Sequence, residues 1–378
     1  MTKILDALKS YKYRHFNIRL LIWVCALTTI GIFVIASATS SDVYEKKQLM
    51  GFFMGLFVAL FASLISYKFI LKFYWLFYIL NLALLVWVKI AGAYRMGATR
   101  WIDLGFFQLQ PSEFTKIFLI LFFARYLYKY REKLNTFPVI AGAVVLFAIP
   151  LALVLKQPDL STSIIISFMF CGIMFVAGLS YKVIGGVLAV AVPVVIVLVY
   201  LVMQPNQKIL EEYQYNRIIG FYDKNNEVAE KISYQQKNSV MAIGSGGLWG
   251  KGLNNNTTTS VKNGNYISEP QTDFIFCIVG EELGFVGSSA VIILLLLIII
   301  ECFYTGANAP DLAGRIIACG YGVLIAIQSF VNIAVVTMLI PNTGLPLPFV
   351  SYGLSSLLSL FCGLGIVLNI SLQRKESI

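Results

Sequence analysis

Ten long apolar segments run through the chain, separated by polar residues, and this pattern predicts membrane-spanning helices. Each segment is long enough to cross the hydrocarbon core of a bilayer, which takes a helix of roughly 20 residues. Lipid admits only helices and closed barrels, and the segments do not show the short alternating pattern of barrel strands. We therefore expect an all-α polytopic membrane protein with ten transmembrane helices, near residues 19–38, 48–66, 70–92, 112–128, 137–155, 161–179, 183–203, 274–303, 314–338 and 350–371.

Composition supports a membrane protein and removes several kinds of chemistry. The 378 residues are 58% hydrophobic and only 13% charged, whereas soluble domains are roughly 45–50% apolar and about 25% charged. The lone histidine, His15, excludes multi-histidine zinc sites and a Ser-His-Asp triad. The six cysteines all fall in apolar segments, where we expect them to pack as small hydrophobic residues without disulfides. The first apolar segment is too long for a signal peptide, so we expect it to be retained.

The distribution of lysine and arginine predicts that both termini lie inside the cell (N-in/C-in). In that orientation the inner loops and tails hold 15 of these residues, the short outer loops and helix starts hold seven, and seven more lie in one long polar stretch. Short loops rich in Lys and Arg stay on the inner side. The net charge of +10 is therefore mostly an inner-face feature, which favours anionic membrane lipids over nucleic acid as partners.

The long polar stretch covers residues 204–273, between the seventh and eighth apolar segments, and would form a large extracellular loop. It contains aromatic and aliphatic residues, so we expect short helices on or dipping into the outer leaflet, with a polar tip at 254–266. Loops of this length are usually functional or disordered. We interpret residues 1–378 as a single transmembrane domain that includes this loop.

Polar motifs precede the fourth, sixth, eighth and tenth segments, which would all begin on the outer face. In PSEFTK, capping residues are followed by Lys116, one turn inside the helix that Glu113 helps to open and near Arg100. Two cations at a helix start form a site for an anionic headgroup, so capping and headgroup binding both stay open. Asp159 of QPDLST is either an ordinary cap or a functional carboxylate, with Lys116 or Lys156 as its partner.

The eighth and tenth segments begin with further candidates. Asp273 of QTDFIF is either a helix cap or a general base that accepts a proton during catalysis. Glu281 and Glu282 lie deeper in the same helix and need cations or hydroxyl groups as partners. The three prolines and two glycines of PNTGLPLPFVSYG predict either a rigid turn or a re-entrant segment that directs Ser351 and Tyr352 into a cavity.

The glycine-rich run GSGGLWGKGL (244–253) looks like a phosphate loop but does not meet that pattern. A phosphate loop would require Gly in place of Ser245 and Ser or Thr in place of Gly252. The glycines permit either a tight turn with close backbone approach, or a wall that admits a sugar or lipid headgroup. Together, the four polar helix starts predict one outer-facing site for an anionic molecule with a lipid tail.

Five motifs stand in order along nearly the whole chain: GATRWIDLG with QPSEFTK (97–116), QPDLST (157–162), QKNSVMAIGSGGLWGKG (236–252), EPQTDFIFCIVGEELG (269–284) and PNTGLPLPFVSYGLSS (341–356). With these motifs the chain resembles the SEDS family of shape, elongation, division and sporulation proteins, typified by RodA and FtsW. It departs from the family at Gln271, where histidine is frequent, at Ser161 and Leu354, where glycine is usual, and in its polar loop tip. A histidine-assisted mechanism is therefore not expected.

The resemblance implies a peptidoglycan glycosyltransferase that polymerises lipid II on the outer face of the bacterial cytoplasmic membrane, together with a class B penicillin-binding transpeptidase. The family's essential aspartate corresponds to Asp273, the expected general base. Forming a β-linkage from an α-linked pyrophosphate inverts the anomeric carbon, and a single displacement needs a carboxylate to take the nucleophile's proton. No cofactor is certain, and a divalent cation, Mg²⁺ or Mn²⁺, stays open. The expected residues for substrate and pyrophosphate are Arg100, Lys116, Arg217, Glu113, Asp159, Gln236, Ser245, Thr272, Glu281, Ser351 and Tyr352.

Two other functions stay open at the level of sequence. Ten helices with intramembrane carboxylates and broken helix starts also suit a lipid II flippase or other transporter, although the polar motifs gather on one face rather than at the midplane. A non-catalytic scaffold for a penicillin-binding protein would keep the partner without the chemistry.

Overall fold

The computed structural model describes residues 13–39, 41–95, 98–103, 105, 108–202, 204, 215, 221, 227–254, 260, 266, 267 and 269–374. Arg217 and most of the predicted polar tip at 254–266 lie outside the described residues.

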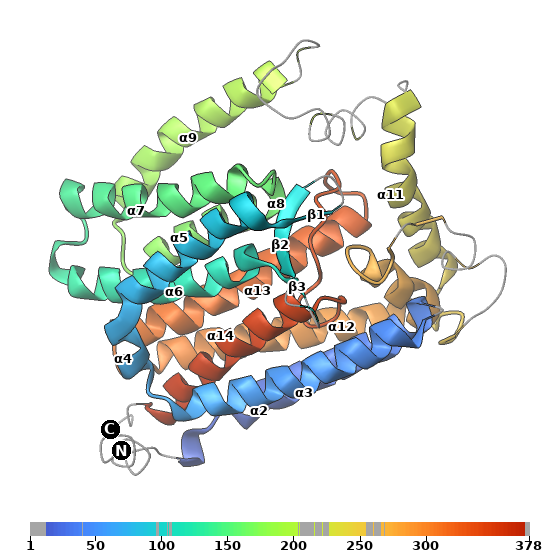
Figure 1. The fold of residues 1–378 in the computed structure, drawn as a ribbon, viewed down its shortest axis with the longest axis horizontal. Helices are drawn as coiled ribbons and strands as arrows, with labels where there is room; N and C mark the ends of the chain where they lie inside the picture. Colours follow the sequence, from blue (N-terminus) through green and yellow to red (C-terminus); the bar gives the residue numbers. More distant parts are fainter. Residues whose placement is uncertain are drawn as a thin grey trace.

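Helices form almost all of the described structure, and most of them pack alongside one another, whereas α9 and α11 lie at its margin (Figure 1). Within the described residues, a helix covers most of each of the ten predicted apolar segments. Seven helical stretches in the described residues are long and apolar enough to cross a membrane, which makes this a polytopic membrane protein. The α-helices are α2 (Ile18–Ala38), α3 (Asp42–Leu64), α4 (Tyr67–Ile70), α5 (Tyr74–Ala91), α6 (Pro111–Lys129), α7 (Phe137–Leu155), α8 (Leu160–Val176), α9 (Tyr181–Val202), α11 (Glu227–Ser245), α12 (Ile275–Ala307), α13 (Leu312–Val336) and α14 (Leu354–Leu372), and the 3-10 helices are η1 (Tyr13–His15), η2 (Leu71–Phe73) and η3 (Arg131–Lys133).

A small antiparallel sheet, which the sequence analysis did not predict, lies between α5 and α6 of the otherwise helical fold. Strands β1 (Ala93–Arg95), β2 (Ala98–Asp103) and β3 (Gln108–Leu109) pair in the order β1-β2-β3. Their sequence contains β-branched and aromatic residues, which favour strands. The sheet places Arg100 of β2 beside the starts of α6 and α8.

Helices α13 and α14 run through the middle of the bundle and are buried along most of their length (Figure 1). The outer helices instead expose large apolar side chains, such as Phe53 and Phe57 of α3. Close packing at the centre depends on small residues, which let helix backbones approach in a membrane. At Gly365 of α14, an added Cβ atom would lie 2.5 Å from the carbonyl oxygen of Ala59 in α3.

Three helix ends meet at one end of the bundle, around Asn17. Its side chain caps α2 through Leu20 N (3.1 Å) and donates to Glu301 (3.0 Å) and Thr305 (3.1 Å) of α12. Its backbone N–H donates to Ser371 Oγ of α14 at 3.1 Å. The N-terminal end of α2 and the C-terminal end of α14 therefore lie on the same side of the bundle, as an even number of membrane crossings requires.

Helix α12 breaks at Gly284, where φ is 65° and ψ is −161°. The glycine loop, defined here as residues 246–252, fills the break with four backbone hydrogen bonds of 2.9–3.1 Å. Two run from the loop to the helix (Lys251 N to Glu281 O and Gly252 N to Glu282 O), and two run from the helix to the loop (Phe285 N to Gly247 O and Val286 N to Leu248 O).

The glycines are required for this contact between the two backbones. An added Cβ atom would lie 2.1 Å from Glu282 O at Gly250 and 2.0 Å from Gly280 O at Gly246. The interpretation as a tight turn with close backbone approach is therefore confirmed. The N–H groups of Lys251 and Gly252 serve α12, so they are not donors for a headgroup.

Candidate catalytic site

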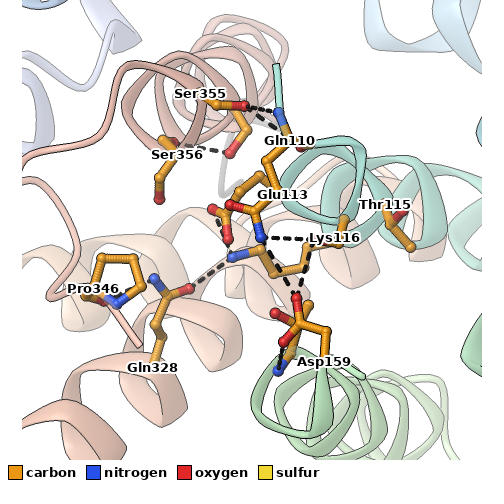
Figure 2. Close-up of polar contacts among 12 residues, drawn as sticks. Gln110, Glu113, Thr115, Lys116, Asp159, Gln328, Pro346, Ser355 and Ser356 are labelled. Atoms are coloured by element: carbon orange, nitrogen blue, oxygen red, sulfur yellow. Dashed lines mark hydrogen bonds and ion pairs between the residues drawn. The ribbon is translucent and has the colours of Figure 1, made fainter. Parts of the chain in front are cut away.

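A buried ion pair lies at the start of α6. Lys116 Nζ is 2.9 Å from Glu113 Oε2, one helical turn away, and 3.0 Å from Gln328 Oε1 of α13 (Figure 2). Lys116 and Glu113 are only 1% and 2% exposed. A buried charge is tolerated when it is paired and hydrogen-bonded, and here Glu113 and Gln328 provide both.

Asp159 caps α8 and connects it to α6. Its Oδ1 accepts from Thr162 N at 3.1 Å, and its Oδ2 accepts from Ser112 Oγ at 3.4 Å and Gln110 Nε2 at 3.5 Å. Arg100 is its ion-pair partner, with Nη1 4.0 Å from Oδ1. The predicted partners, Lys116 and Lys156, were therefore wrong, because β2 brings Arg100 to this carboxylate.

Arg100 is held mainly by backbone. Its guanidinium donates to the carbonyl oxygens of Gln157, at 3.1 Å, and Pro158. The Arg100 side chain is still 23% exposed, whereas its partner Asp159 is 4% exposed. Of the two predicted phosphate-binding cations that the structure describes, Arg100 is accessible and Lys116 is enclosed.

Asp273 stands in the turn immediately before α12 and is partly exposed. The three carbonyl oxygens of Gln271, Thr272 and Asp273 each accept a hydrogen bond from another part of the chain. Their donors are Tyr352 N (2.9 Å), Ser351 Oγ (2.7 Å) and Asn332 Nδ2 (2.8 Å), in that order.

Two amide side chains on α13 join the Lys116 pair to the Asp273 turn. Gln328 and Asn332 are four residues apart and therefore lie on one face of the helix. Gln328 accepts from Lys116 and donates to Pro346 O at 3.0 Å. Asn332 donates to Asp273 O and to Leu345 O at 2.6 Å. Gln328 and Asn332, on neighbouring turns of α13, thus contact Lys116 and the Asp273 backbone, and both also donate to the loop at Leu345 and Pro346.

The remaining predicted site residues make contacts that hold elements together. Gln236 of α11 donates to Val335 O (2.8 Å) and Ile340 O (2.9 Å), and Ser245 donates to Ala242 O (2.7 Å) at the end of α11. Tyr352 packs its ring edge-on against Tyr44 at 4.9 Å.

The two adjacent glutamates of α12 have the partners that the sequence predicted. Glu281 pairs with Lys251 at 2.8 Å, and Glu282 accepts from Ser37 Oγ at 2.6 Å. The expectation of a cation and a hydroxyl partner is confirmed. Gln236, Ser245 and Glu281 lie on α11 and α12 rather than in the Arg100–Lys116 cluster.

Gln328 and Asn332 were not predicted as site residues, because the sequence of α13 was interpreted as an apolar span. The signal was present: QSFVN places two amides at a spacing of four in an otherwise apolar helix. A buried amide in a membrane helix needs partners, so this spacing indicates a polar strip facing other protein elements.

No three His, Cys, Asp or Glu side chains gather to hold a metal ion in the part of the chain that the structure describes. The two carboxylates nearest to the cations, Glu113 and Asp159, are each paired already. The described residues therefore offer no preformed metal site of three such ligands.

Fold and site together define a multi-pass helical membrane protein in which α13 connects a buried cluster of charged side chains to the backbone of a partly exposed aspartate. Residues 18–376 match the model of the cell cycle protein family FtsW/RodA/SpoVE, so the chain belongs to this family. The resemblance drawn from its motifs is confirmed.

Relatives of known name cover most of the chain. A probable peptidoglycan glycosyltransferase FtsW of Trichlorobacter lovleyi is 35% identical over 97% of this chain and 96% of its own. The peptidoglycan glycosyltransferase MrdB of Escherichia coli K12 is 35% identical over 79% of this chain and 77% of its own.

Solved structures share the fold. A chain from a peptidoglycan synthase complex that coordinates polymerization and crosslinking has a TM-score of 0.81 and 26% identity, covering 96% of this chain and 99% of its own. The rod shape determining protein RodA of Thermus thermophilus has a TM-score of 0.69 and 26% identity, covering 97% and 98%.

Proposed function

We propose that this protein is a peptidoglycan glycosyltransferase that polymerises lipid II into glycan strands, with Asp273 as its general base. Membership of the FtsW/RodA/SpoVE family and relatives that carry this activity in their names support the proposal. The observation that carries it is the joining of Asp273 to a cluster of cations through Gln328 and Asn332 of α13.

The environment of each carboxylate favours Asp273 as the base. Glu113, Asp159 and Glu281 are only 1–3% exposed. Asp273 is partly exposed at the edge of α12, where an acceptor sugar can reach it. In the proposed step, the 4-hydroxyl of lipid II attacks the anomeric carbon of the growing glycan, and Asp273 takes the hydroxyl proton. The bond to the undecaprenyl pyrophosphate breaks in the same displacement, which inverts the anomeric carbon.

The negative charge of the leaving pyrophosphate must be neutralised by cations, and we propose that Arg100 is the first to bind it. Glu113 and Asp159 balance the charges of Lys116 and Arg100 in this structure. The pyrophosphate would therefore replace Asp159 as the partner of Arg100, while Lys116 lies beneath and Arg217 is a third candidate cation. Arginine suits this role because its planar fork can bind two phosphate oxygens at once.

All ten apolar segments span the cytoplasmic membrane in the proposed topology, with both termini inside and residues 204–273 as an extracellular loop of a single transmembrane domain. The excess of Lys and Arg in the inner loops supports this orientation. It places the starts of α6, α8 and α12 on the outer side, where lipid II would be polymerised. A class B penicillin-binding transpeptidase is the proposed partner, supported by the similarity to a chain of a peptidoglycan synthase complex.

Purified protein in liposomes, supplied with lipid II, tests the proposal against both alternatives. Glycan ladders on a gel support a polymerase. Movement of the headgroup across the bilayer without ladders would indicate a flippase. If the protein alone shows neither polymerisation nor headgroup movement, a scaffold for a transpeptidase is favoured. Parallel reactions with chelator test the divalent cation. Undiminished ladders would show that polymerisation needs none, and ladders that are lost with chelator and restored by Mg²⁺ or Mn²⁺ would show that it needs one.

A further inference from the structure

The backbone that carries Asp273 is held more firmly than a helix start requires. Three successive carbonyl groups, those of residues 271–273, each accept a hydrogen bond from outside the helix. Fixing three successive peptide groups also fixes the direction in which the Asp273 side chain leaves the backbone, because the intervening φ and ψ angles can no longer change independently.

The described hydrogen bond to the Asp273 carbonyl comes from outside the helix. In a regular α-helix the N–H of Cys277 would donate to the oxygen four residues earlier, which is Asp273 O. Here Cys277 N donates to Phe274 O at 2.9 Å. Asn332 of α13 donates to Asp273 O at 2.8 Å, so a side chain from another helix helps to orient this peptide group.

The two side-chain donors are fixed in turn. Asn332 is 1% exposed and also donates to Leu345 O, and Ser351 is buried and accepts from Leu347 N at 2.7 Å. Gln48 of α3 donates to Ser351 O at 3.2 Å. The donors are therefore anchored in α13 and in the loop before α14, and that loop is in turn tied to α3.

We propose that Ser351 and Asn332 are positioning residues that hold Asp273 at the distance and angle needed to take the acceptor's proton. The role rests on the proposed function of Asp273. It differs from the substrate contact expected for Ser351 from sequence, since both hydrogen bonds of its hydroxyl serve the protein. A displacement of about 1 Å at a reacting group costs on the order of 100-fold in rate, so losing one donor is expected to matter.

Initial rates of lipid II polymerisation by the purified full-length protein, measured over a range of lipid II concentrations, test this role. Ser351→Ala and Asn332→Ala are expected to lower kcat about tenfold to 100-fold, with KM within about threefold of wild type. Ser351→Thr keeps the hydroxyl and is expected to keep most of the wild-type kcat.

Asn369→Ala is the matched control. Asn369 is a fully buried amide near the other end of α14, where it donates to Ser63 O at 2.7 Å and accepts from Tyr67 N at 2.8 Å. Its loss is expected to lower the thermal unfolding midpoint about as much as Asn332→Ala, and to leave kcat per folded molecule unchanged.

Several results would overturn the positioning role. If the wild-type protein is active, one such result is an equal kcat for the Asn332→Ala and Asn369→Ala variants. Others are a rise in KM alone, or a Ser351→Thr variant as slow as Ser351→Ala. If Asn332→Ala does not fold, the two Ser351 variants decide the question. A wild-type protein that forms no glycan would instead overturn the proposed function, and the positioning role with it.

Discussion

The ion pair between Lys251 and Glu281 fastens the glycine loop to α12, and replacing Lys251 with methionine tests how much it stabilises the fold. Lys251 Nζ lies 2.8 Å from Glu281 Oε1, and the two side chains are 23% and 1% exposed. Methionine keeps much of the apolar stem but removes the ammonium group from the buried Glu281 carboxylate. The hydroxyl of Ser260, 3.4 Å from Oε2, is a weak contact of the same carboxylate.

The expected decrease in the free energy of unfolding follows from the burial of the Lys251–Glu281 pair. Removing one partner of a buried ion pair destabilises a protein by about 3–5 kcal/mol, and the partial exposure of Lys251 lowers the expectation to about 2–4 kcal/mol. The double variant Lys251→Met/Glu281→Gln removes both charges, so it should be more stable than Lys251→Met alone. The coupling energy from the complete double-mutant cycle should be about 2 kcal/mol.

The free energy of unfolding can be measured by titrating SDS into mixed micelles and following the fluorescence of the five tryptophans. Lys46→Met is the control, because Lys46 and Asp42 form an ion pair of 3.7 Å in which both side chains are largely exposed. Exposed pairs contribute little, so no measurable loss is expected there. Equal losses for Lys251→Met and Lys46→Met, or a coupling energy near zero, would refute the assigned contribution of the buried pair.

Three other substitutions test the break in α12, the proposed phosphate-binding role of Arg100 and the packing of α14 on α3. Gly284→Ala forces a side chain into a backbone region that is almost exclusive to glycine and should destabilise by about 1–3 kcal/mol or more, with faster hydrogen exchange in the glycine loop; unchanged exchange there would contradict the fit between loop and helix. Arg100→Ala should raise KM for lipid II about tenfold or more, since a charge-assisted contact contributes about 1.5–3 kcal/mol, and an unaltered KM would remove Arg100 from the phosphate site. Gly365→Leu should prevent α14 from packing on α3 and reduce the yield of folded protein, whereas normal yield and thermal stability would show that the close contact with Ala59 is not required.

The apolar segments could be predicted closely because a helix that crosses a membrane needs an uninterrupted apolar run of about its own length. The fifth segment was predicted at residues 137–155 and corresponds to α7 (Phe137–Leu155), and the first was predicted at 19–38 and corresponds to α2 (Ile18–Ala38). The break in α12 could not be predicted in this way. Gly284 lies in a long run of mostly apolar residues, and glycine is common in membrane helices, so the run gives no sign that the backbone changes direction there.

The site was predicted in its parts but not in its connections. Helix-start motifs pointed to Lys116, Asp159 and Asp273, because polar residues stand out beside apolar runs. The partner of Asp159 was mistaken, since a strand pair brings Arg100 to it from 59 residues away in the sequence. Strands of two to six residues are too short for alternation to be recognised. The joining role of Asn332 depends on contacts between helices, which local pattern does not record.

The central claim is that Asp273 removes the proton from the acceptor sugar, and the rate of glycan formation by Asp273→Ala tests it most directly. Protein purified at wild-type yield and reconstituted with lipid II should give no ladder above background. The control Asp42→Ala, which removes a largely exposed carboxylate at the start of α3, should polymerise at the wild-type rate. Ladders from Asp273→Ala at a rate close to wild type would contradict the account.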